Sequence, residues 1–79
     1  MNAPTFGARL RAARERRGVT AAHLASLIGI HATVINGYEA GQVKPGVDNL
    51  RALALTLDIS ADYLLGLSDS TARIKRGTP

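Results

Sequence analysis

Apolar residues recur along this chain at intervals of three and four, the spacing that places side chains on one face of an α-helix. The first such segment follows Thr5, a residue type that caps helix N-termini. Its apolar positions are Phe6, Leu10 and Ala13, and Gly18 is suited to end it because glycine enters the left-handed conformation without steric cost. The pattern therefore predicts a first helix between Thr5 and Gly18.

Two short helices are predicted next. Thr20 is placed to cap the first of them, and Gly29 to end it. The second runs from about His31 to Ala40, and Gly41 closes it. The inward-facing apolar positions of the two helices are Leu24, Ala25, Ile28, Val34, Ile35 and Tyr38.

The remaining pattern predicts two more helices and a tail. A turn at residues 44–46 precedes a helix from about Val47 to Leu57, and Ser60 caps a short helix, Ala61 to Leu65, that ends at Gly66. No segment alternates with a period of two, so a sheet is not expected. The chain is thus predicted to be all-α, with a compact five-helix domain over residues 1–67 and a basic, flexible tail over residues 68–79.

Composition narrows the class of protein. Seventy-nine residues suffice for one small domain, and the absence of cysteine excludes disulfides and thiolate metal sites. The N-terminus does not resemble a secretory signal, and no apolar run is long enough to span a membrane, so we expect a cytoplasmic protein without membrane contact. The net charge of +4 is compatible with nucleic-acid binding, but it is a weak signal alone.

Candidate catalytic and metal-binding chemistry is absent from the sequence. The two histidines, His23 and His31, lie eight residues apart on different predicted helices and would make a poor metal pair. His23 is expected at the surface, and His31 either caps the third helix or touches a DNA backbone. No serine–histidine–aspartate arrangement, phosphate-binding glycine loop or carboxylate pair is present. We therefore expect no enzyme, no cofactor and no metal.

The stretch from Ala21 to Ala40 meets the requirements of two helices that cross at a sharp angle. Ala25 is small where the helices approach, and Gly29 stands at the corner, where a positive φ is needed and a Cβ would clash. Ile30, Ile35 and Tyr38 would wedge the later helix onto the core. The opposite face of that helix would remain free.

With this pattern the sequence resembles the phage repressor and Cro family of helix-turn-helix proteins, also known as the xenobiotic response element family, whose fold is the lambda-repressor-like DNA-binding domain. The resemblance covers roughly residues 6–67. It is carried by Arg9-Leu10-Arg11-Ala12-Ala13-Arg14, Gly18-Val19-Thr20, Leu24-Ala25, Gly29-Ile30, Ile35-Asn36-Gly37-Tyr38-Glu39-Ala40-Gly41, Lys44-Pro45 and Asp62-Tyr63-Leu64-Leu65-Gly66.

The resemblance implies that the third helix enters the major groove of double-stranded DNA. The base-contacting positions would then be His31, Ala32, Thr33, Asn36 and Gly37. Asn36 could pair with an adenine edge, Thr33 could use its hydroxyl or its methyl group, and Ala32 could touch a thymine methyl group. Gly37 would either let the backbone approach the DNA closely or contact nothing.

Phosphate contacts are expected before and after the third helix. At the start of the second helix they would come from the Thr20 hydroxyl and the amides of Ala21 and Ala22. After the third helix they would come from Asn36, Gln42 and Lys44. The resemblance further implies an ion pair that joins two helices, Arg14 with Glu39. The other arginines nearby are expected to form a solvated face; they are Arg9, Arg11, Arg16 and Arg17.

Members of this family usually bind as two-fold dimers, which implies a homodimer here. The candidate interface residues are Leu55, Tyr63, Leu64 and Leu67, and Leu27 is a further apolar position expected at the surface. The sequence thus predicts a transcriptional regulator, most plainly a repressor, on a palindromic operator. The alternative is a protein-interaction module of the antitoxin type, with a regulatory protein as partner. A free-standing regulator and a piece of a longer one are indistinguishable from the sequence.

Overall fold

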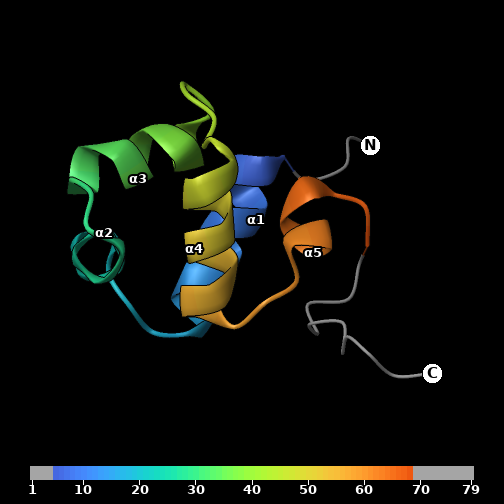
Figure 1. The fold of residues 1–79 in the computed structure, drawn as a ribbon, viewed down its shortest axis with the longest axis horizontal. Coiled ribbons are helices and arrows are strands. Elements are labelled where there is room, and N and C mark those ends of the chain that lie inside the picture. Colours follow the sequence, from blue (N-terminus) through green and yellow to red (C-terminus); the bar gives the residue numbers. More distant parts are fainter. Residues whose placement is uncertain (1–4, 69–79) are drawn as a thin grey trace.

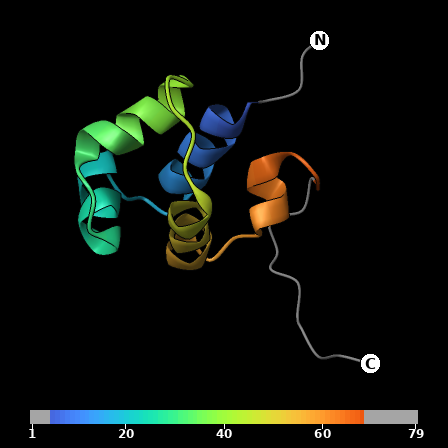
Figure 2. The same ribbon diagram turned by 45° about the horizontal axis from the view of Figure 1, so that its top comes forward.

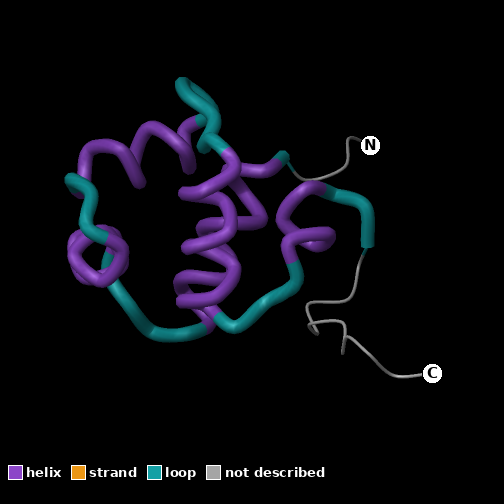
Figure 3. Tube along the Cα trace, in the orientation of Figure 1, coloured by secondary structure: helices purple, strands orange, loops and turns teal. Residues whose placement is uncertain are grey.

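The computed structural model describes residues 5–68, which form five α-helices and no strand (Figures 1 and 3). The helices are α1 (Phe6–Arg16), α2 (Ala21–Ile28), α3 (Ala32–Ala40), α4 (Val47–Leu57) and α5 (Ala61–Leu65). The predicted all-α, five-helix fold is therefore confirmed. The tail predicted from Ser68 onward lies, except for Ser68 itself, outside the described residues. Over the same described range, none of the helices combines the length and the apolar character needed to cross a membrane.

Hydroxyl side chains begin three of the five helices. Each accepts a hydrogen bond from the backbone amide three residues later: Thr5 from Ala8 (3.1 Å), Thr20 from His23 (3.0 Å) and Ser60 from Tyr63 (3.3 Å). Such caps satisfy amides that have no partner within the helix, and each stabilises by about 1 kcal/mol. His31 occupies the N-cap position of α3, but its side chain makes no capping hydrogen bond, so its predicted capping role is limited to the backbone.

The core collects at least one large apolar side chain from every helix. The largest fully buried side chains are Leu10, Leu24, Ile35, Leu53, Leu57 and Leu64. In Figures 1 and 2, α2 and α3 lie on one side of α4 and α5 lies on the other, with α1 packed against both groups. Because every helix depends on this one core, α3 is held in place by contacts distant in sequence.

Two glycines matter here for different reasons. Gly29 has φ of +80°, which side chains rarely adopt, but a Cβ there would meet no atom within 4 Å. The expected need for a positive φ is therefore correct, whereas the expected clash with surrounding atoms is not. Gly7 was not singled out from the sequence: a Cβ there would lie 2.6 Å from the Tyr38 carbonyl oxygen and closer still to that of Glu39. Gly7 thus lets α1 approach the end of α3.

Candidate nucleic-acid interface

The corner between α2 and α3 is built by Ala25 and Gly29. Ala25 is buried, and its carbonyl oxygen accepts hydrogen bonds from the amides of both Gly29 and Ile30, the latter at 3.0 Å. These bonds satisfy the Ala25 carbonyl group in the last turn of α2, while the left-handed Gly29 redirects the chain. The turn therefore sets the direction in which α3 leaves the corner.

One face of α3 is anchored to the core. Ile35 and Tyr38 are buried, and the Tyr38 hydroxyl oxygen accepts a hydrogen bond of 2.9 Å from the Asn49 side chain on α4. Thr33, Asn36 and Ala40 are exposed on the opposite face. The helix consequently offers an accessible outer face on a rigidly held backbone. Asn49 was missed by sequence reasoning, since an asparagine near a helix start has no signal that names its partner.

The predicted base-contacting residues separate into two groups. His31, Thr33 and Asn36 are exposed, and Ala32 is partly buried, so their side chains remain available to a ligand to different degrees. Gly37 is buried, because the side chain of Val43 lies over it. Of the two alternatives predicted for Gly37, this burial favours the second, in which Gly37 contacts nothing. Val43 was not predicted as a site residue, and a valine in a loop gives little signal in the sequence.

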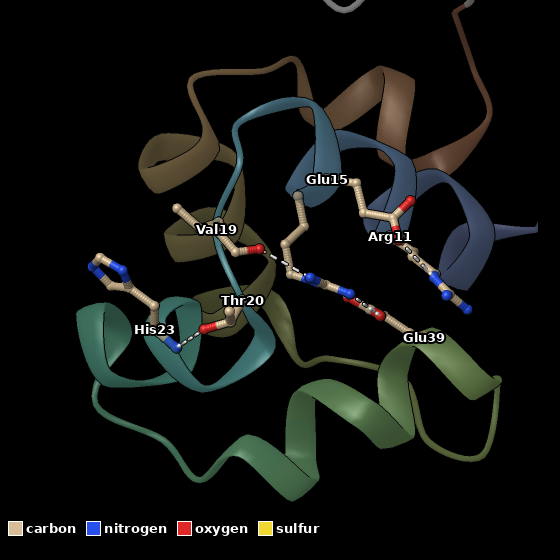
Figure 4. Close-up of polar contacts among 7 residues, drawn as sticks. Arg11, Glu15, Val19, Thr20, His23 and Glu39 are labelled. Atoms are coloured by element: carbon tan, nitrogen blue, oxygen red, sulfur yellow. Dashed lines mark hydrogen bonds and ion pairs between the residues drawn. The ribbon is translucent and has the colours of Figure 1, made fainter.

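The predicted phosphate contacts lie at two exposed places. At the N-terminus of α2, the Thr20 hydroxyl oxygen accepts the amide hydrogen of His23, as Figure 4 shows, so its own hydrogen can still be donated. Ala22 is exposed beside it, and Ala21 is partly buried. Gln42 and Lys44 are exposed in the loop after α3. Helix amides, a hydroxyl and an ammonium group are all donors suited to an anion.

Arg14 and Glu39 form the ion pair that the family resemblance implied. Their Nε and Oε2 atoms are 2.6 Å apart, and a second bond joins Nη2 to Oε1 at 3.1 Å. The Arg14 Nη1 group also donates to the Val19 carbonyl oxygen at 2.9 Å. Figure 4 marks interactions at both Val19 and Glu39 with dashed lines. Their side chains are only 14% and 10% exposed. This network joins α1, the α1–α2 connection and the end of α3.

The pKa of Arg14 is raised above its ordinary value. The main cause is the hydrogen bonding to Glu39, and the negative charges of Glu39 and Glu15 act in the same direction, while burial opposes them. The guanidinium therefore stays protonated although it is largely buried. Its charge is engaged by Glu39 and the Val19 carbonyl oxygen, which connects α1 to the end of α3.

The other arginines of α1 and its C-cap residue Arg17 do not all form a solvated face. Arg11, Arg16 and Arg17 are exposed as expected, and Arg11 pairs with Glu15 at 3.2 Å. Arg9 contradicts the expectation, because it is only 8% exposed and its guanidinium carbon lies 5.0 Å from the centre of the Tyr63 ring. This cation–π geometry gives Arg9 a packing role between α1 and α5.

The predicted dimer residues are likewise divided by burial. Leu55 and Leu67 are exposed, as is Leu27, and Tyr63 is partly buried. Leu64 is fully buried and belongs to the core, so it cannot meet a second chain, and this part of the prediction is wrong. The neighbouring Leu65 is exposed instead. Among residues 5–68, no group of three histidine or acidic side chains could hold a metal ion.

Comparison with known proteins identifies the class to which this architecture belongs. A family model described as Helix-turn-helix matches residues 10–64. The chain therefore belongs to this family of DNA-binding transcriptional regulators, of the repressor-like xenobiotic response element type.

Particular relatives agree with this assignment. The chain is 46% identical over 61 residues to YobD of Bacillus subtilis, an uncharacterised HTH-type transcriptional regulator, covering 77% of this chain and 54% of YobD. It is 35% identical over 65 residues to repressor protein C2 of Salmonella phage P22, covering 82% of this chain and 30% of the repressor. The chain thus spans about half or less of the length of these relatives.

A solved structure shows the same fold. The crystal structure of the P22 c2 repressor in complex with a synthetic operator and Tl⁺ matches with a TM-score of 0.79 at 32% identity. The match covers 84% of this chain and 100% of that one. These relatives are regulators and repressors, and neither their names nor that structure favours a protein-interaction module.

Proposed function

We propose that this domain is a sequence-specific DNA-binding module that inserts α3 into the major groove of an operator and regulates transcription, most plainly as a repressor. The observation that carries the proposal is the exposed outer face of α3, on which Thr33 and Asn36 stand while Ile35 and Tyr38 fix the helix to the core. An α-helix fits the major groove, where each base pair presents a distinct pattern of donors, acceptors and methyl groups.

The chemistry of the exposed residues assigns their proposed roles. Asn36 pairs with an adenine edge, and Thr33 contacts a base through its hydroxyl or methyl group, with His31 and Ala32 at the start of the helix beside them. The donors at the N-terminus of α2 and the side chains of Gln42 and Lys44 contact phosphates, which fix the register of α3. The related P22 c2 repressor, whose crystal structure is a complex with a synthetic operator, supports DNA as the ligand of this domain.

Two copies of the domain act together on a palindromic operator in this proposal. A single domain contacts only about half of a typical operator, and two-fold dimers place their recognition helices about one helical turn apart, roughly 10 bp. The exposed Leu55 and Leu67, with Tyr63, are the proposed contacts between copies. The cytoplasmic location expected from the sequence stays a prediction.

The test is selection of binding sites from a random duplex library at physiological salt, with Asn36→Ala and Lys44→Ala for comparison. The wild type should select an inverted repeat. Asn36→Ala should relax the preference at one position per half-site, whereas Lys44→Ala should weaken all sequences alike and reduce the salt slope by about 1.

A charge-matched control separates a phosphate contact from the loss of a positive charge. Arg11→Ala also removes one cation, but Glu15 already neutralises that charge at 3.2 Å, so the salt slope should stay near the wild-type value. If the wild type selects no motif and binds every duplex at the non-specific level, the proposed function is wrong. A single half-site instead of an inverted repeat would contradict only the dimer.

A further inference from the structure

The outer face of α3 contains one position without a side chain. Gly37 follows Thr33 by four residues and Asn36 by one, so helical geometry places it on the same outward-facing half of α3. A glycine there would be expected to leave a gap in the surface. The structure instead buries Gly37.

Val43, in the loop after α3, fills that gap. A Cβ on Gly37 would lie 3.1 Å from Val43 Cγ2, which is closer than an ordinary van der Waals contact. The Gly37 carbonyl oxygen accepts hydrogen bonds from the amides of Gln42 (2.9 Å) and Val43 (3.4 Å). The loop is therefore folded back over the end of α3 and holds the valine beside its outer face.

Covering Gly37 does not bury Val43. Its exposed fraction is 49%, so part of the isopropyl group still faces solvent next to the side of α3 that carries Thr33 and Asn36. An apolar group cannot hydrogen-bond to a base edge, and the apolar group that the major groove offers is the C5-methyl of thymine. The chemistry of Val43 thus complements one base in particular.

We propose that Val43 is a specificity-determining residue that packs against a thymine methyl group, at the position on the recognition surface where Gly37 has no side chain. This inference rests on the proposed insertion of α3 into the major groove. When the thymine methyl group is removed, the complex buries about one apolar carbon fewer. The affinity for DNA should then fall roughly three- to fivefold.

The test uses the operator selected by the wild type, with each thymine replaced in turn by deoxyuridine, which lacks only the methyl group. At the thymine that Val43 contacts, the wild type should lose about three- to fivefold in affinity when deoxyuridine replaces it. Val43→Ala should bind the thymine duplex more weakly and show no further loss on that substitution. A shielding role for Val43 alone would not produce this dependence on the methyl group.

Val47→Ala is the matched control, since it removes the same two carbons from a valine that is 81% exposed and does not cover Gly37. It should keep the wild-type response to every deoxyuridine. Thermal melts check that each variant is folded. If Val43→Ala unfolds, Val43→Asn replaces it, since asparagine keeps a branched side chain beside Gly37 but has no methyl group to contact thymine.

The outcomes separate this inference from the proposed function. If the wild type selects an operator but Val43→Ala retains the same loss at every deoxyuridine, or if the operator contains no thymine whose methyl group matters, the role of Val43 is refuted while DNA binding stands. If the wild type selects no operator, the proposed function fails and this inference fails with it.

Discussion

Glu39→Ala is expected to destabilise the domain by about 3 kcal/mol, because it leaves the Arg14 guanidinium largely buried without its counter-charge. Breaking a buried ion pair from one side typically costs about 3–5 kcal/mol. The lower end applies here, since side-chain exposures of 14% and 10% leave some access to water. A domain of this size has a total stability of only about 4–12 kcal/mol, so the loss is a large fraction of it.

Thermal and urea unfolding followed by circular dichroism provide the assay. A loss of about 3 kcal/mol should lower the Tm of so small a domain by about 12–24 °C. Glu15→Ala is the matched control, because Glu15 also pairs with an arginine, Arg11, but on the exposed surface of α1. That variant should cost less than about 0.5 kcal/mol.

Replacement of both partners distinguishes a stranded charge from lost packing. Arg14→Met combined with Glu39→Leu should be more stable than Glu39→Ala alone, because no unpaired charge remains in the interior. The Val19 carbonyl oxygen loses its donor in this double variant, so recovery should be incomplete by about 1 kcal/mol. The reasoning is refuted if Glu39→Ala costs no more than Glu15→Ala. It is also refuted if the double variant loses as much stability as the sum of the losses measured for Arg14→Met and Glu39→Leu separately.

Three further predictions test the packing. Gly7→Ala should lower the free energy of unfolding by about 2 kcal/mol or more, because its Cβ would overlap backbone carbonyl groups of α3. A Tm equal to that of the wild type would contradict the close approach of α1 to α3. Gly29→Ala should lower the free energy of unfolding by only about 1–2 kcal/mol, since backbone strain at φ +80° is the sole penalty. A loss of stability equal to that of Gly7→Ala would contradict this. Leu64→Ala should lower the free energy of unfolding in urea by about 2–5 kcal/mol, because Leu64 is fully buried. Leu67→Ala should weaken self-association in sedimentation and have little effect on the stability of the monomer. The opposite pattern would show that Leu64, and not Leu67, contacts the second copy.

The helix boundaries could be predicted from the sequence because they depend on local chemistry. A hydroxyl residue such as Thr20 accepts the amide three positions on, and a glycine such as Gly29 enters the left-handed conformation whatever surrounds it. These signals recur within a few residues, so all five helices were located to within one residue of their observed starts. Their apolar spacing also indicated which face of each helix is buried.

Several individual positions depended on contacts between distant parts of the chain. Leu64 lies in the core while Leu65 is exposed, and the helical pattern of a five-residue segment is too short to separate them. Arg9 is buried because the Tyr63 ring lies beside it, 54 positions away in the chain. Neither the burial of Leu64 nor that of Arg9 can be predicted from the residues adjacent to it in the sequence.

The sequence by itself determined the helices, the sharp turn at Gly29 and, through the family resemblance, the pairing of Arg14 with Glu39. Only the tertiary structure decided which surface a ligand can meet. Gly37 has the spacing of an exposed residue on α3, yet Val43 covers it when the loop folds back. Caps and periodicity act over one or two turns of helix, whereas burial depends on every atom that packs nearby, including those from other elements.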